Sequence, residues 1–475
     1  MYQCLSPCDE GWRDLSESRG WVPYRRTVLP CGVRVVTEEM THVRSCSVGI
    51  WVNAGSRWED PAENGVSHFI EHLVFKGTTT RSARRIAEEI DGVGGQLNAF
   101  TGKDHTCFYA KVLDEHVDLA VDILCDLVCH PLLDPADVEK ERGVVAEEIG
   151  MYEDSPEDVV HDEIARAAWG SLSVGMPVLG TQETLGNLTR DSVARYMGAH
   201  YTCENVVVAA AGHATHERIV EAVEKHMSLP SSTLTPEARP SWTPGVRVFR
   251  PKNTEQVHMC LGVEAFNRRH PKRYALHVLD ISIGGGMSSR LFQKLREDRG
   301  LVYSTYSYVA SFDDVGSFIF YAATSPDRVR AVEDLVREEL EEVASRGISA
   351  EELARGKEQL KSGLVLNLET TNSRMGRLGR LELFREPLET PDEVFRRIDD
   401  VTEDDVREVA AELLAGAVPV AAAVGPRKAK SSFVRRERDG RQGRQDRPEA
   451  AVAPEGHRGA ACRAAHGNSP RRRKA

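Results

Sequence analysis

Two histidines and a glutamate at helical spacing are the residues of this chain best suited to chemistry, in the string His68-Phe69-Ile70-Glu71-His72. An α-helix turns once in 3.6 residues, so His68 and His72 share a face and can bind one metal ion, with Glu71 beside them. Two neutral imidazoles suit zinc that activates a water, and the carboxylate can take the proton of that water. Such a string can also be two histidines on a solvated helix face, so a further ligand is needed.

A second stretch, DPADVEKERGVVAEEIGMYED from Asp134 onward, supplies that ligand. Its Asp-Pro start and its periodicity predict a helix. Glu141 and Glu148 are about two turns apart and share a face, and neighbouring valines and an isoleucine indicate that this face is turned inward. Carboxylates there are costly unless they are paired or bound to metal. On its own such a helix is more often a solvated acidic surface, but beside the HxxEH string a metal ligand is favoured.

The two stretches together resemble a known family. HFIEHLVFKGT, followed 76 residues after His72 by Glu148 within ERGVVAEEI, is similar to the inverzincin family of pitrilysin, insulysin and mitochondrial processing peptidase, most of all its bacterial processing-peptidase-like branch. The resemblance covers most of residues 22–425. It implies that His68, His72 and Glu148 bind Zn²⁺ and that Glu71 is the general base. It also implies that Glu141, at the start of the family's E-x6-E string, supports the ligands.

The segment NAFTGKDHTCFY, residues 98–109, resembles the substrate-binding edge strand of the family. The resemblance implies that a substrate pairs there as an added strand, with its backbone against Asn98, Ala99, Phe100 and Thr101. The glycine-rich run GVGG just before this strand permits close approach of another backbone. Asn98 could equally satisfy a turn.

A further pair of candidate residues lies in LREDRGLVY, where Arg296 and Tyr303 are seven residues apart. The resemblance implies that this arginine and tyrosine reach the substrate and polarise the scissile carbonyl. Without the resemblance, a surface arginine beside a structural tyrosine would be the preferred interpretation.

The composition bounds the class of protein. A chain of 475 residues with 41% apolar content predicts two or three ordinary globular domains. No stretch approaches 18 continuous apolar residues, so no membrane span is expected. The acidic residues near the N-terminus argue against a mitochondrial presequence, and the ten cysteines do not form a disulfide framework. Cys4 and Cys8 are interpreted as part of a loose terminus, and a cytoplasmic protein is expected.

The net charge of -12 combines two opposed parts. Residues 427–475 carry 15 Lys and Arg against 5 Asp and Glu, a net of +10, which leaves about -22 on the remainder. This tail is rich in Arg, Gly and Pro and is expected to be disordered. It could bind nucleic acid or an acidic partner, but a dispensable extension is favoured. The negative charge on the residues before 427 would attract basic peptides.

An internal repeat organises the rest of the chain. A Pro-, Ser- and Thr-rich linker, residues 229–246, separates residues 22–228 from residues 247–425, which repeat the order of strand-like and helical runs but lack HxxEH. We therefore expect an α+β fold of two homologous domains, each a largely antiparallel sheet covered by helices. The resemblance implies the same plan, in which the two domains form half of a clamshell.

These observations predict a zinc metalloendopeptidase that hydrolyses extended peptides or presequence-like segments. The alternative is a non-catalytic partner or scaffold subunit, because some members of the family have lost the metal site. A structural zinc site would normally close with a fourth protein ligand, and none lies at useful spacing.

The expected assembly is a homodimer. Long members of the family have four domains where this chain has two, and two-fold pairing is the commonest way to restore the missing half. Arg296 and Tyr303 of one chain would then complete the site of the other. Pairing with a related subunit stays open.

Overall fold

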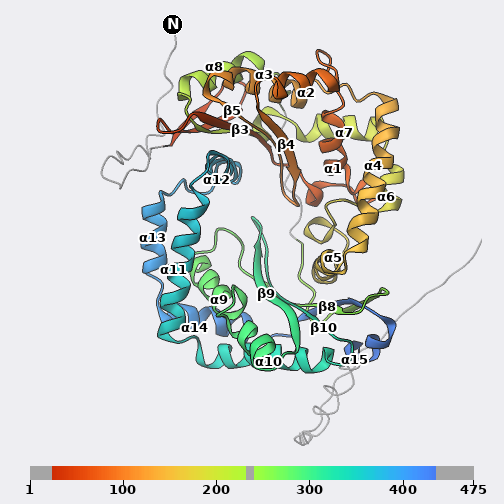
Figure 1. Ribbon diagram of the computed structural model, residues 1–475, viewed down its shortest axis with the longest axis vertical. Coiled ribbons are helices and arrows are strands. Elements are labelled where there is room, and N and C mark those ends of the chain that lie inside the picture. The colour runs from red at the N-terminus through yellow and green to blue at the C-terminus, as the bar shows by residue number, and fades with distance from the viewer. Residues whose placement is uncertain (1–23, 232–239, 435–475) are drawn as a thin grey trace, which may run out of the picture. The chain divides into compact units, whose positions relative to one another are not determined.

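Two β-sheets organise the residues that the computed structural model describes, 24–231 and 240–434 (Figure 1). Three parts of the sequence interpretation lie outside these residues: the pair Cys4 and Cys8, the centre of the expected linker, and the tail from Arg435 onward. None of the described helices combines the length and apolar character that crossing a bilayer requires.

The first sheet has six strands in the order β1-β2-β6-β3-β5-β4. Only the β2–β6 pair is parallel. The strands are β1 (Arg25–Val28), β2 (Arg34–Glu39), β3 (Ser45–Val52), β4 (Gln96–Thr101), β5 (Thr106–Leu113) and β6 (Val206–Gly212). One face is packed by α1 (Val66–Val74), α2 (Ala83–Asp91), α3 (Val117–Cys129), α7 (Arg190–His200) and α8 (His216–His226), and the short helix α6 (Gln182–Asn187) precedes α7.

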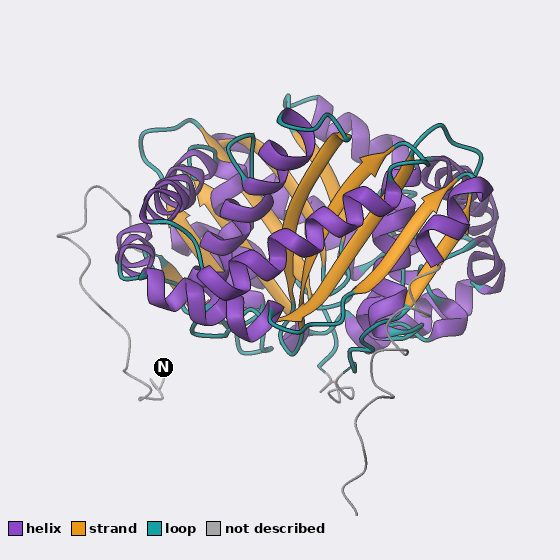
Figure 2. Ribbon diagram, turned by 90° about the horizontal axis from the view of Figure 1, so that it is seen from below, coloured by secondary structure: helices purple, strands orange, loops and turns teal. Residues whose placement is uncertain are grey.

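The second sheet has five strands in the order β7-β11-β8-β10-β9, with only β7–β11 parallel. The strands are β7 (Arg247–Pro251), β8 (Val257–Ala265), β9 (Val302–Ser311), β10 (Gly316–Thr324) and β11 (Val420–Gly425). Its helices are α9 (Arg273–Gly284), the π-helix η6 (Phe292–Glu297), α10 (Val329–Arg346), α11 (Ala350–Asn367), α13 (Pro391–Asp399) and α14 (Glu403–Leu414). Figure 2 shows helices covering the strands.

The two sheets follow the same path. When β1 is set aside, the order β2-β6-β3-β5-β4 corresponds strand by strand to β7-β11-β8-β10-β9. In both sheets the parallel pair lies at one end. At the other end lies the first strand of a hairpin, β4 in the β4–β5 hairpin or β9 in the β9–β10 hairpin, and this strand is the free edge. This confirms the internal repeat and the expected α+β fold of two homologous domains.

Each half of the chain contributes a helix to the sheet of the other half. The helix α5 (Pro156–Trp169) packs on β8 and β11, and α12 (Thr371–Leu383) packs on β3 and β6, opposite α3 and α8 (Figure 1). Small residues permit this: an ideal Cβ at Gly379 of α12 would lie 2.2 Å from Trp51. The linker therefore separates the two sheets in the sequence. In space, α5 and α12 each pack on the sheet that the other half of the chain forms.

Two ion pairs also join the first half of the chain to the second. The guanidinium of Arg57 lies 2.9 Å from Asp314, and Glu382 of α12 accepts a hydrogen bond from Arg26 at 3.0 Å. Breaking a buried pair by removing one partner costs about 3–5 kcal/mol. The Arg57–Asp314 pair therefore helps to hold the first half of the chain against the second, whereas the pair of Arg26, which is half-exposed, contributes less.

The first eight residues of the expected disordered tail, 427–434, are structured. Residues Arg427–Ala429 form a 3-10 turn, η7, and Lys430–Val434 form the helix α15. Phe433 is fully buried, and the guanidinium of Arg247 lies 4.4 Å from its ring centre. The sequence interpretation rested on the density of basic residues and overlooked this one aromatic anchor.

A buried carboxyl in α9 gives a first prediction. Burial raises the pKa of Asp280 from 3.8 to about 6, although Ser307 donates a hydrogen bond to it at 2.5 Å. An acid whose pKa is higher in the folded state opposes folding once it ionises, so stability is lost as the pH rises through that interval. Asp280→Asn removes this cost, on the order of 3 kcal/mol. We expect the variant to melt above the wild type at pH 8 and with it near pH 4, as measured by calorimetry across pH. A difference in melting temperature between Asp280→Asn and the wild type that does not change with pH would contradict the raised pKa of Asp280.

Candidate active site

A buried glutamate caps the helix that carries the HxxEH string. Glu59 accepts hydrogen bonds from the backbone N–H groups of Gly65 at 2.6 Å and Ser67 at 2.8 Å, and from the side chain of Asn64 at 2.7 Å. Burial raises the pKa of Glu59, and these bonds act in the opposite direction. A carboxylate here also stabilises the positive end of the helix dipole. Sequence analysis missed Glu59 because its distance from the helix start fits no capping pattern.

The three predicted metal ligands meet between α1 and α4 (Pro135–Asp154). Glu148 Oε2 lies 3.6 Å from His68 Nε2 and 3.2 Å from His72 Nε2. Among the described residues, these three form the one group of His, Cys and carboxylate side chains with metal-ligand spacing, their ligand atoms lying within 4.8 Å of one another.

This arrangement fits zinc. Ligand atoms about 2.1 Å from a tetrahedral ion are roughly 3.4 Å apart, close to both measured distances. Burial, and to a lesser degree His72, lowers the pKa of His68 to about 4, so its imidazole is neutral at pH 7 and can donate a lone pair. His68 Nδ1 is buried without a hydrogen-bond partner among the described residues.

Glu141 lies behind His72, on the side away from Glu148. Its side chain is almost fully buried, with Oε2 3.5 Å from His72 Nδ1 and Oε1 2.8 Å from Lys76 Nζ. A carboxylate beside the second nitrogen of a metal-binding histidine fixes the orientation and tautomer of the ring. The charge of Lys76 compensates the burial of this carboxylate.

Glu71 lies between the metal ligands and the edge strand. Its Oε2 accepts a hydrogen bond from Thr101 Oγ1 at 2.6 Å. Burial raises the pKa of Glu71, whereas Thr101 and His72 lower it and Glu148 adds to the rise. A carboxyl group with a raised pKa is suited to accept a proton near neutral pH.

The strand β4 is a free edge of the first sheet and packs against α1. The bond from Gly102 N–H to His105 O closes the β4–β5 turn, so the antiparallel alternation directs the N–H and C=O of Leu97, Ala99 and Thr101 away from β5. The side-chain oxygen of Asn98 accepts from the N–H of Ala99 at 2.8 Å. Phe100 packs edge-on against Trp51.

Arg296 and Tyr303 lie in the second half of the chain. Arg296 is in η6, and Tyr303 is the second residue of β9, the strand that corresponds to β4. The guanidinium of Arg296 lies 5.1 Å from the ring centre of Tyr303, which is 73% exposed. Among the described residues, neither contacts the His-His-Glu cluster.

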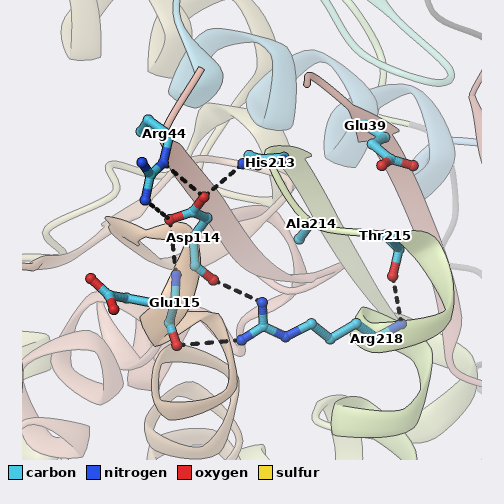
Figure 3. A pocket seen from close by; sticks show the side chains of 8 residues that line it. All are labelled: Glu39, Arg44, Asp114, Glu115, His213, Ala214, Thr215 and Arg218. Carbon is cyan, nitrogen blue, oxygen red and sulfur yellow. Dashed lines mark hydrogen bonds and ion pairs between the residues drawn. The ribbon is translucent and has the colours of Figure 1, made fainter. Parts of the chain in front are cut away.

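A second polar pocket lies at the end of the first sheet near α8 (Figure 3). Asp114 binds Arg44 and His213 there, and Arg218 binds the backbone oxygens of Asp114 and Glu115. These charges are paired with one another, so the pocket does not resemble a metal site.

Comparison with protein families decides the identity. The profile of the insulinase family, peptidase family M16, matches residues 34–182, and that of the peptidase M16 inactive domain matches residues 187–360. The chain belongs to the insulinase family of peptidases. The inactive-domain profile falls mainly on the half that lacks HxxEH.

Relatives named as zinc proteases match more than four-fifths of the chain. An uncharacterized zinc protease of Bacillus subtilis is 44% identical over 391 residues, 82% of this chain and 95% of the relative. An uncharacterized zinc protease of Streptomyces coelicolor is 44% identical over 417 residues, 86% of this chain and 91% of the relative. The protein is therefore a metallopeptidase with zinc as its cofactor, as the sequence predicted.

Solved structures share the fold. A protease from Helicobacter pylori superposes with a TM-score of 0.79 at 21% identity, covering 85% of this chain and all of that chain. A peptidase M16 inactive domain from Pseudomonas fluorescens also has a TM-score of 0.79, at 19% identity, with 85% of this chain and 98% of that chain covered. These similarities support the architecture of two related domains.

Proposed function

We propose that this peptidase is a zinc endopeptidase, which cleaves extended peptides or presequence-like segments at internal peptide bonds of the substrate. The observation that carries the proposal is the cluster of His68, His72 and Glu148, with Glu71 between that cluster and a free sheet edge. A peptide bond held along the edge would pass both the metal ligands and the base.

The chemistry follows from these side chains. His68, His72 and Glu148 would hold zinc, which when bound polarises a carbonyl and makes a water more acidic. Glu71 would accept the proton of the attacking water and return it to the leaving amine. Glu141 would orient His72 through its contact at 3.5 Å.

The edge strand β4 would hold the substrate. Leu97, Ala99 and Thr101 direct backbone donors and acceptors away from β5, which favours pairing with an added strand. Asn98 now satisfies the N–H of Ala99, so it would have to move when a substrate carbonyl takes its place. Pairing through the backbone places few demands on side chains, and the net charge of about -22 before residue 427 favours basic substrates.

The test is a peptide library incubated with the protein and analysed by mass spectrometry. We expect internal cleavage that a chelator abolishes and that added zinc restores. Removal of single residues from peptide ends, or cleavage that a chelator leaves unchanged, would contradict the proposal.

We further propose that the active enzyme is a homodimer with shared sites. The support is the position of Arg296 and Tyr303 at the free edge that corresponds to β4, away from the metal ligands of their own chain. A tyrosine that is 73% exposed is available to a second chain. In the dimer it would donate a hydrogen bond to the scissile carbonyl held by the partner's zinc site.

Complementation tests the shared site. Glu71→Gln chains and Tyr303→Phe chains should each be weakly active alone, because in each homodimer both sites lack one group. In the mixed dimer one site keeps Glu71 and receives an intact Tyr303, so activity should exceed the mean of the two parents on a fluorogenic peptide. The matched control pairs Glu71→Gln with Glu148→Gln chains, where both sites stay defective. A fully active monomer would overturn the assembly.

A further inference from the structure

The last residue of the edge strand makes a direct hydrogen bond to the proposed general base. Thr101 Oγ1 lies 2.6 Å from Glu71 Oε2. Glu71 belongs to the metal-binding helix α1, whereas Thr101 ends β4. The contact therefore joins the strand that would hold substrate to the side chain that would move the proton.

The position of Thr101 is fixed by its surroundings. Thr106, its partner on β5, donates to Ala54 O at 2.9 Å and lies 3.5 Å from Thr101 Oγ1. The next residue, Gly102, accepts the N–H of Ser56, and an ideal Cβ at Gly55 would lie 2.4 Å from Gly102 O. The end of β4 is thus packed tightly against the segment that leads into α1, and the hydroxyl has little freedom to move.

Because side chains alternate between the two faces of β4, the side chain and the backbone of Thr101 point in different directions. Side chains at 97, 99 and 101 are half-buried, whereas those at 96, 98 and 100 are exposed. The side chain of Thr101 accordingly points toward α1 and Glu71. Its backbone N–H and C=O, like those of Ala99, point away from β5, outward from the free edge of the sheet.

We infer that Thr101 is a positioning residue for Glu71, which couples substrate pairing to the placement of the base. The inference rests on the proposed function. A carboxylate with one oxygen held by Thr101 presents the other oxygen in a fixed direction, whereas without the hydroxyl it can rotate away. When a substrate strand pairs with the backbone of Thr101, the same residue sets the distance between the scissile bond and Glu71.

The experiment compares Thr101→Val, which keeps the shape and removes the hydroxyl, with Thr101→Ser, which keeps the hydroxyl. In Thr101→Val we expect kcat to fall about 10- to 100-fold while KM and bound zinc stay near the wild-type values. Thr101→Ser should recover most of this loss. The matched control is Thr37→Val in β2, because Thr37 is another strand threonine whose hydroxyl is bonded to a titratable side chain, His216 at 2.8 Å. It should retain wild-type kcat.

A double-mutant cycle separates positioning from other roles. If Thr101 acts through Glu71, adding Thr101→Val to Glu71→Gln should change the residual kcat by no more than about twofold. Independent, multiplicative losses would show that Thr101 acts on substrate directly and would overturn the inference. Wild-type kcat in Thr101→Val, with Glu71→Gln inactive, would overturn it while leaving the proposed function intact. Full activity of Glu71→Gln would overturn both.

Discussion

Glu71→Gln should keep its zinc and lose turnover by a factor of about 10² or more. Glutamine has nearly the shape of glutamate, and its side-chain oxygen can still accept the hydrogen bond that Thr101 donates at 2.6 Å. The neighbouring ligands His68, His72 and Glu148 stay in place. The change therefore removes the ability to take a proton and little else.

The measurement is kcat on an internally quenched peptide, with zinc determined by mass spectrometry on the same sample. Glu147→Gln, an exposed neighbour of Glu148 on α4, serves as the control for a change of one charge near the site. Wild-type turnover in Glu71→Gln would remove Glu71 from the mechanism. Loss of zinc from the variant would mean that Glu71 supports the metal site instead.

The sequence predicted those parts of the site that depend on local periodicity. The i,i+4 spacing places His68 and His72 on one face of α1. The seven-residue spacing places Glu141 and Glu148 on one face of α4, with Glu141 buried and Glu148 half-exposed. The family resemblance supplied the pairing of the two helices, because no spacing within one helix specifies what packs against it.

Contacts between distant segments could not be predicted in this way. The bond between Thr101 and Glu71 depends on how β4 packs against α1, and the capping of α1 by Glu59 depends on the path of an irregular loop. The exchange of α5 and α12 between the sheets depends on close fits such as that of Gly379 on Trp51. A hydrophobic pattern shows that a helix face is buried but does not name the sheet that buries it.

The second large effect that we expect is the loss of zinc from Glu148→Gln. Glu148 provides the one carboxylate of the His-His-Glu cluster and is 44% exposed, so the substitution removes a ligand without disturbing the core. An amide oxygen is a much weaker zinc ligand than a carboxylate, and only two histidines would remain.

Purified wild-type protein should carry about one zinc per chain, and Glu148→Gln should lose most of it. His72→Ala should do the same, because it removes a ligand from the other helix. Glu147→Gln, one residue away and exposed, should keep its zinc, which separates loss of a ligand from loss of charge on α4. Circular dichroism should show that all three variants keep the helical content of the wild type. Full zinc in both Glu148→Gln and His72→Ala would place the metal elsewhere, and the roles of Glu71 and Thr101 would then have no metal site to serve.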